Sequence, residues 1–190
     1  MDVKLTGSEL YLAAQVGVAR QMEAMRKGLP DKHGFDGIEG WTVHIEGAAG
    51  EVAVAKALGV YWNGSLNTFK SQADVQRLEV RTRSKSYYEL LIRPDDDSKA
   101  VFVLVTGRAP DFEVRGWIQG SEAKKDEWLQ TYGGRPPAYF VPHDALHPIS
   151  ELSGPSITYT TERSKPLAEV MASDVPRGLS PDDVATDIKA

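Results

Sequence analysis

The sequence contains no cysteine among its 190 residues. A chain without cysteine cannot form a disulfide scaffold, a thiolate zinc site or a cysteine nucleophile. Long apolar runs are also missing, so no segment reads as a membrane-spanning helix, and the opening residues MDVKLTGSEL lack the apolar stretch of a secretory signal. These absences predict a soluble, cytoplasmic protein with no membrane partner.

A surplus of positive charge is missing as well. The formal net charge is -5 at pH 7, whereas proteins that coat nucleic acid nonspecifically are usually basic. A nuclease can nevertheless be acidic overall, because its metal-binding carboxylates lower the net charge while a local basic patch binds phosphate. The charge argues against a general nucleic-acid coat and leaves a nuclease open.

The chain is 41% hydrophobic and 26% charged, a composition typical of a globular domain with a packed core. A capping-box pattern at Thr6 to Glu9 opens a helix predicted over about residues 8–27. A second helix is predicted over about 45–58 and is ended by Gly59. Its glycine and alanine content indicates close packing against a sheet.

Strands are predicted over residues 78–84, 88–92, 101–106, 112–118 and 138–141, with a helix over 121–130. This order predicts an α+β fold with an α/β-type core, in which a mixed central β-sheet is flanked by helices. We expect residues 1–150 to form this domain and residues 151–190 to form a partly irregular C-terminal extension. Within the extension, Ser180 begins a short predicted helix. The extension is where we expect contacts with a second copy or another protein.

The segment LEVRTRSK, residues 78–85, alternates apolar and charged side chains. One face of this strand carries a carboxylate followed by three cations, namely Glu79, Arg81, Arg83 and Lys85. Considered alone, such alternation is typical of a half-exposed strand with a solvated outer face. Two more acids stand near the strand in the predicted order of elements, Glu51 on the second helix and Asp74 just before the strand.

These acids suggest a metal site. Asp74 and Glu79 can converge on one hard divalent cation, Mg²⁺ or Mn²⁺, which takes oxygen ligands and keeps several waters. Arg81, two residues along the same strand face, would then lie beside a bound phosphate and stabilise developing negative charge. Arg83 and Lys85 would extend a phosphate-binding track.

From about residue 45 to 146 the sequence resembles the PD-(D/E)XK, or restriction-endonuclease-like, nuclease superfamily. The resemblance rests on GAAGEVAVAKALG, Asp74, LEVRTR, FEVRGWIQGSEA and YFVPHDAL, in an order similar to the core of uncharacterised phage-type members. It implies a restriction-endonuclease-like fold and Mg²⁺-dependent or Mn²⁺-dependent hydrolysis of DNA phosphodiesters. For a phage-encoded chain the location would be the host cytoplasm.

The resemblance also implies roles for individual residues. Asp74 takes the first acid of the motif, Glu79 the second, and Glu51 the helix acid, so that these three would be the metal ligands. Arg81 departs from the motif, which has lysine at this position. Arginine does not readily lose a proton, so activation of water by a neutral amine is lost, while phosphate binding and charge stabilisation survive. The catalytic set is then Asp74, Glu79 and Arg81, and Arg81, Arg83 and Lys85 would bind DNA.

Two other functions remain open. Arg81 favours a catalytically inactive nuclease-fold protein that binds nucleic acid or a protein partner. The acidic charge and the long segment after Glu151 favour a structural or inhibitory phage protein on another α+β fold.

Three further patterns have simpler interpretations. His143 and His147 have the spacing of zinc ligands on a helix, but flanking prolines favour a surface turn. The acids at 95–97 are interpreted as a solvated turn, because three consecutive carboxylates cannot all point inward. Trp62 is interpreted as a core residue, although Tyr61 and Trp62 also suit stacking on a base.

Overall fold

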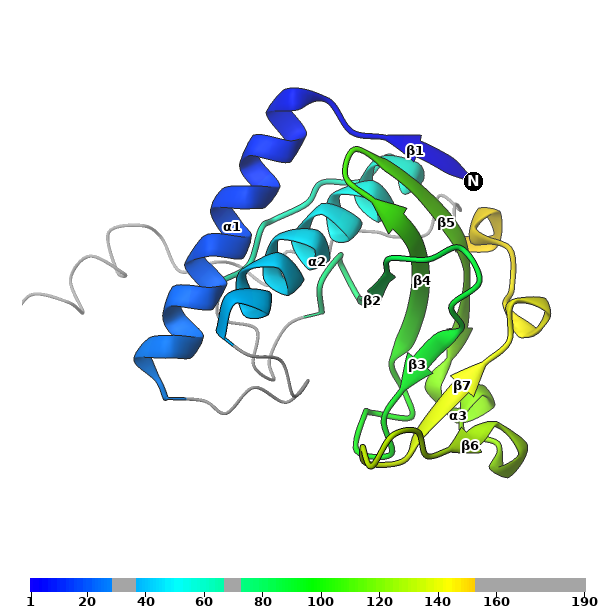
Figure 1. Cartoon of the computed structure of the whole chain (residues 1–190). Helices are drawn as coiled ribbons and strands as arrows, with labels where there is room; N and C mark the ends of the chain where they lie inside the picture. Colours follow the sequence, from blue (N-terminus) through cyan, green and yellow to red (C-terminus); the bar gives the residue numbers. More distant parts are fainter. Residues whose placement is uncertain (29–36, 67–72, 153–190) are drawn as a thin grey trace, which may run out of the picture. The chain divides into compact units, whose positions relative to one another are not determined.

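The computed structural model describes residues 1–28, 37–66 and 73–152 (Figure 1). The chain divides into two units, Met1–Gly154 and Pro155–Ala190. The second unit, including the helix start predicted at Ser180, lies outside the described residues. Within the first unit the elements form an α+β fold with a mixed central sheet, as the strand and helix patterns predict.

Two long helices, α1 (Gly7–Arg26) and α2 (Gly37–Leu58), run side by side (Figure 1). The predicted capping box is confirmed at α1, where the Glu9 amide donates to Thr6 Oγ1 and the Thr6 amide donates to the Glu9 carboxylate. Helix α2 starts about two turns earlier than expected. Its first half packs against α1, where Gly17 lies directly on the Ile45 backbone, so tertiary contact extends the helix beyond its local signal.

The strands form two sheets instead of one. A four-stranded sheet has the order β1 (Asp2–Lys4), β5 (Asp111–Gln119), β4 (Val101–Arg108), β2 (Leu78–Arg83). Strands β2 and β4 are parallel and the other pairs are antiparallel. A three-stranded antiparallel sheet has the order β3 (Leu90–Ile92), β7 (Ala138–Val141), β6 (Leu129–Gln130). The short strand β1 had no sequence signal, and its pairing with β5 forms it.

The two faces of the four-stranded sheet bury different cores. Helix α2 covers one face, where its alanines pack with Val80 and Val103. The three-stranded sheet covers the other face, where Phe102 and Leu104 of β4 pack with Leu90 of β3. Because side chains alternate along β2, the charged residues of LEVRTRSK lie on this second side, in register with Phe102 and Leu104.

The prediction of a single helix over residues 121–130 is wrong. Helix α3 spans only Gly120–Ala123, and a 3-10 helix, Asp126–Trp128, leads into β6. The backbone leaves helical geometry at Lys124, whose Nζ donates to the main-chain oxygens of Pro94 and Asp96. Two further 3-10 helices, His143–Ala145 and Ile149–Leu152, follow β7.

Gly50→Ala is expected to lower the free energy of unfolding by about 2–3 kcal/mol. A Cβ at position 50 would lie 1.9 Å from Thr82 Oγ1 on β2, so the helix would have to move away from the sheet. Urea denaturation of the two proteins measures this cost. Gly47→Ala is the matched control on the same helix, because its Cβ meets nothing within 4 Å. Equal midpoints for the two variants would contradict the close approach of α2 to β2.

Candidate functional site

Asp74 is held against the edge of β2 by a tight turn. The main chains of Val75 and Leu78 exchange hydrogen bonds of 2.8 and 3.1 Å, which folds the residues before β2 back onto the strand. The Asp74 Oδ2 atom then accepts the Val80 amide hydrogen at 2.8 Å. Burial raises the pKa of Asp74 to about 6, and the nearby Glu51 charge adds to this rise. Asp74 is therefore a fixed, desolvated carboxylate.

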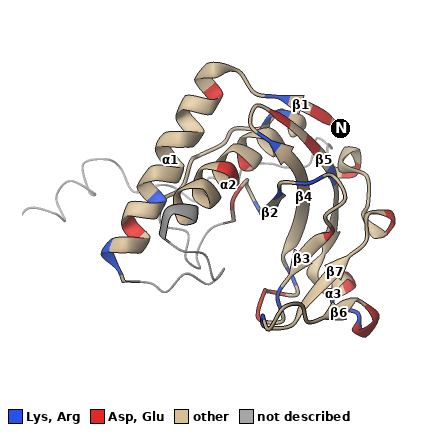
Figure 2. Ribbon diagram, viewed as in Figure 1, with Lys and Arg blue, Asp and Glu red and all other residues tan. Residues whose placement is uncertain are grey.

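Glu79 lies next to this group. Its side chain is 31% exposed, and its pKa is raised first by burial and then by the charge of Asp74. Each of the three acids selected from the sequence thus interacts with at least one of the others, since Glu51 acts on Asp74 and Asp74 acts on Glu79. Figure 2 shows the acidic positions on α2 and before β2 beside the basic positions of β2.

Glu51 is buried, and both of its oxygens accept hydrogen bonds from other parts of the chain. Arg20 of α1 donates to both of its oxygens, at 2.5 and 2.9 Å, and Trp62 Nε1 donates to Oε2 at 3.0 Å. Arg20 Nε also donates to the Ser65 carbonyl. Burial disfavours the Arg20 charge, but the bonds to Glu51 hold the Arg20 pKa above its usual value. Arg20 and Glu51 therefore form a buried, bidentate ion pair.

Sequence reasoning missed Arg20 and gave Trp62 no polar partner. The available signal for Arg20 was its spacing from Ala13 and Gly17, the two buried small residues of α1. These three positions recur every three to four residues, which places them on the helix face that meets α2.

Arg81 joins two carboxylates at the same end of the site. Its Nη1 lies 3.3 Å from Glu79 Oε2 and its Nη2 lies 3.2 Å from Asp96 Oδ2, while its guanidinium carbon is 5.1 Å from the ring centre of Phe102. The interpretation of Asp96 as a solvated acid is wrong. The Arg93 amide donates to Asp96 Oδ2 at 2.9 Å and turns that carboxylate inward, towards Arg81.

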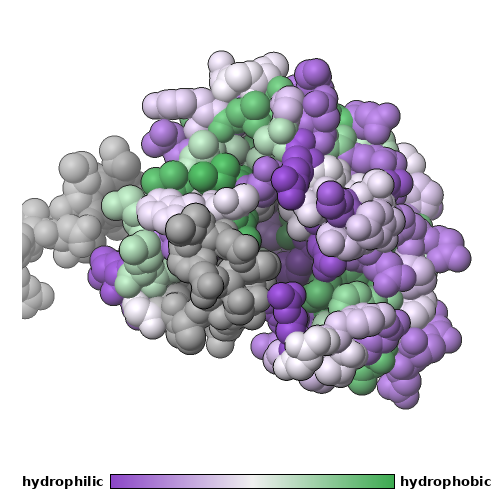
Figure 3. All heavy atoms as spheres, viewed as in Figure 1, coloured by the Kyte–Doolittle hydropathy of each residue, from purple (hydrophilic) through white to green (hydrophobic). Residues whose placement is uncertain are grey.

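Beyond Arg81, the same strand face carries Arg83, Lys85 follows the strand, and the neighbours of both differ from those of Arg81. The Arg83 guanidinium lies 4.7 Å from the ring centre of Tyr88, and burial lowers the pKa of Arg83. Lys85 is exposed. Among the described residues, no carboxylate forms an ion pair with Arg83 or Lys85, in contrast to Arg81. Figure 3 shows the surface hollowed between the helices and the smaller sheet, with hydrophilic residues at the bottom.

His143 and His147 do not share a helix face. The turn around His143 is a 3-10 helix, and His143 Nε2 contacts the Tyr88 carbonyl oxygen at 2.9 Å. His147 Nε2 is 2.9 Å from Glu122, and its ring packs on Trp117. The two imidazoles serve separate contacts, in agreement with the surface-turn interpretation.

In the part of the chain that the structure describes, no group of three His, Asp or Glu side chains is arranged to hold a metal ion. Glu51 uses both oxygens on Arg20. Asp74 and Glu79 each keep one oxygen, Oδ1 and Oε1, that accepts no hydrogen bond from the described residues. Mg²⁺ commonly binds through only one or two carboxylates and fills its other positions with water and phosphate. Asp74 and Glu79 therefore each offer one oxygen of the kind that a hard cation takes as a ligand.

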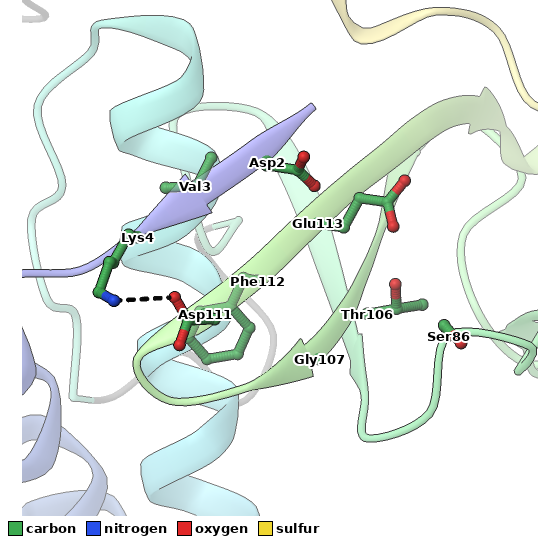
Figure 4. A pocket seen from close by; sticks show the side chains of 9 residues that line it. All are labelled: Asp2, Val3, Lys4, Ser86, Thr106, Gly107, Asp111, Phe112 and Glu113. Carbon is green, nitrogen blue, oxygen red and sulfur yellow. Dashed lines mark ion pairs between the residues drawn. The ribbon is translucent and has the colours of Figure 1, made fainter.

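A cavity of about 430 Å³ lies elsewhere, between β1, the β4–β5 hairpin and the segment after β2 (Figure 4). Lys4 at its edge pairs with Asp111 at 3.4 Å. Its lining contains three carboxylates and one lysine, so it disfavours a phosphate. The lining residues are Asp2, Val3, Lys4, Ser86, Thr106, Gly107, Asp111, Phe112 and Glu113.

Comparison of the chain with protein-family models, with curated proteins and with solved structures finds no match. None of the helices among the described residues has the length and apolar character to cross a membrane.

Proposed function

We propose that this chain is a cytoplasmic, metal-dependent nuclease with a restriction-endonuclease-like fold, acting on DNA phosphodiester bonds. The observation that carries the proposal is the interaction between the carboxylates of Asp74 and Glu79, which lie beside Arg81. Burial raises the pKa of both acids, and a neighbouring charge adds to each rise: that of Glu51 at Asp74 and that of Asp74 at Glu79. Interacting carboxylates with raised pKa values are typical of functional sites, and a bound cation would relieve their repulsion.

Each residue has a role that follows from its contacts. Asp74 and Glu79 would hold Mg²⁺ or Mn²⁺, and Glu51, engaged by Arg20, would reach it through water. Such an ion supplies polarisation of the phosphate and a more acidic bound water. Arg81 is tethered between Glu79 and Asp96, so its remaining N–H groups are kept beside the ligands, where they can donate to phosphate oxygens. The reaction is hydrolysis, with water as nucleophile and the 3′ oxygen as leaving group.

A second candidate is a catalytically inactive nuclease-fold protein that binds DNA or a protein partner. One observation favours it: two arginines already form ion pairs with three of the acids at the site. Arg20 binds Glu51, and Arg81 binds Glu79 and Asp96. If these ion pairs persist in solution, they replace the cation and the protein binds without cutting.

Calorimetric titration of Mn²⁺ into the wild type and Asp74→Asn separates the two candidates. We expect the wild type to bind Mn²⁺ and Asp74→Asn to lose binding, because the substitution removes the more buried of the two proposed ligands. The Glu113→Gln variant changes a carboxylate of the distant cavity and should bind as the wild type does. Equal Mn²⁺ binding by wild type and Asp74→Asn would remove Asp74 from the site, and no binding by the wild type would leave the inactive candidate.

Asp74→Asn should also change the stability of the metal-free protein. Since the pKa of Asp74 is raised from 3.8 to about 6 in the folded state, ionisation of Asp74 weakens the folded protein as pH rises through this range. Asp74→Asn should therefore be more stable than the wild type by roughly 1–3 kcal/mol at pH 8 and should lose this advantage near pH 4. Urea denaturation in EDTA at the two pH values measures the difference.

A further inference from the structure

The segment that follows β2, Ser84–Tyr88, is termed here the tyrosine loop. It is anchored at two points and closed by one hydrogen bond of its own. Arg115 Nη2 donates to the Ser86 carbonyl at 3.0 Å, His143 Nε2 lies 2.9 Å from the Tyr88 carbonyl oxygen, and the Tyr88 amide donates to the Lys85 carbonyl at 3.1 Å. The anchors come from β5 and from the turn after β7, so the loop is held in one conformation by distant parts of the chain.

This fixed loop presents an aromatic ring to solvent. Tyr87 is 71% exposed, although its ring meets Tyr88 edge-on at a centroid distance of 4.9 Å. The ring of Tyr88 is in turn covered by the Arg83 guanidinium. Tyr88 therefore packs as a support, whereas Tyr87 contributes little to the core. A large ring kept exposed on an ordered loop is suited to binding a flat partner.

Two cations stand close to Tyr87 in the sequence. Arg83 precedes the loop and Lys85 lies within it, and among the described residues neither forms an ion pair with a carboxylate. Each can therefore bind an external anion without breaking an ion pair with a described carboxylate. An aromatic platform with adjacent cations is the arrangement that binds single-stranded nucleic acid, in which bases stack and phosphates pair with Lys or Arg.

We propose that the tyrosine loop is a stacking site for an unpaired base, with Arg83 and Lys85 binding the adjoining phosphates. The inference rests on the proposed function, because the loop continues the strand that carries Glu79 and Arg81. At about 3.3 Å per residue, Arg83 lies roughly 13 Å along β2 from Glu79. The substrate class is thus single-stranded DNA, or a duplex with an unpaired end, since both faces of a base inside a duplex are covered by its neighbours. An acidic peptide would pair with Arg83 and Lys85, but its carboxylate side chains would not stack on the Tyr87 ring.

Fluorescence anisotropy with a labelled single-stranded oligodeoxynucleotide and its duplex tests this site in EDTA, where no metal-dependent cleavage occurs. We expect the full chain to bind the single strand more tightly than the duplex, and Tyr87→Ala to weaken single-strand binding by roughly 10-fold. Tyr87→Trp should retain binding and show fluorescence quenching beyond that of the wild-type tryptophans. Lys85→Ala should flatten the slope of log K against log salt by about 0.7.

Tyr11→Ala is the matched control, since Tyr11 is 66% exposed on α1, away from these cations. Equal single-strand affinity of wild type and Tyr87→Ala, preferred binding of the duplex, or no binding of either DNA would overturn the stacking site. Displacement of the DNA by polyglutamate together with insensitivity to Tyr87→Ala would assign the cations to an acidic protein partner instead. Loss of binding in Tyr87→Ala without any Mn²⁺ binding by the wild type would support the stacking site and overturn the nuclease. Mn²⁺ binding by the wild type, together with unchanged single-strand binding by Tyr87→Ala, would support the nuclease and overturn the stacking site.

Discussion

Glu79→Gln is expected to abolish Mg²⁺-dependent or Mn²⁺-dependent cleavage of DNA, and Arg81→Ala to slow it by roughly 100-fold. Glu79 supplies one of the two available carboxylates and also receives the Arg81 guanidinium at 3.3 Å. Losing its charge removes a proposed ligand and one tether of Arg81 together. Arg81→Ala loses the phosphate contact but keeps both carboxylates, so its effect should be smaller.

Arg81→Lys distinguishes the role of the guanidinium from that of the charge. Lysine restores the residue of the PD-(D/E)XK motif and keeps the cation, so we expect activity to be preserved or raised. Arg83→Ala should mainly weaken DNA binding and lower its salt dependence by about one unit of slope. Arg26→Ala removes an exposed cation of α1 that forms an ion pair with Glu23, three residues earlier on the same helix, and it should leave cleavage unchanged.

Cleavage of single- and double-stranded DNA by these variants and the wild type, with each metal, is the measurement. A wild type that does not cleave, together with an Arg81→Lys variant that gains no cleavage, would overturn the enzymatic proposal. The catalytically inactive nuclease-fold protein would then be the better description.

Arg20→Ala is expected to lower the free energy of unfolding by about 3–5 kcal/mol. The Arg20 and Glu51 side chains are only 12% and 6% exposed, so the substitution leaves a buried carboxylate whose donor among the described residues is Trp62. Arg20 links α1 to α2 through Glu51 and to the segment carrying Ser65, so its loss also weakens the contacts between these parts. Urea denaturation at pH 7 gives the difference.

Arg26→Ala is the matched control on the same helix. Its ion pair with Glu23 is exposed, and such pairs contribute at most about 1 kcal/mol. The double variant Arg20→Leu, Glu51→Leu should recover much of the lost stability, since replacing both members of a buried pair by apolar residues is often neutral. Similar losses in Arg20→Ala and Arg26→Ala would show that the buried pair does not form in solution.

Local patterns in the sequence were sufficient for several features of this protein. The capping box at Thr6 determines the start of α1, because both of its hydrogen bonds join residues three apart. The period of two along LEVRTRSK places Glu79 and Arg81 on one strand face. The short separation between Asp74 and Glu79 keeps their carboxylates close once the turn at Val75 forms.

Only the tertiary structure decided the partners of these groups. Arg20 reaches Glu51 because the small residues Ala13 and Gly17 let α1 approach α2, and no pattern local to Glu51 encodes a donor on another helix. Asp96 was predicted to face solvent because three consecutive carboxylates cannot all point inward, yet the Arg93 amide turns it towards Arg81. Hydrogen-bond and charge partners far apart in sequence depend on how helices and sheets pack, and that packing is set by the whole core.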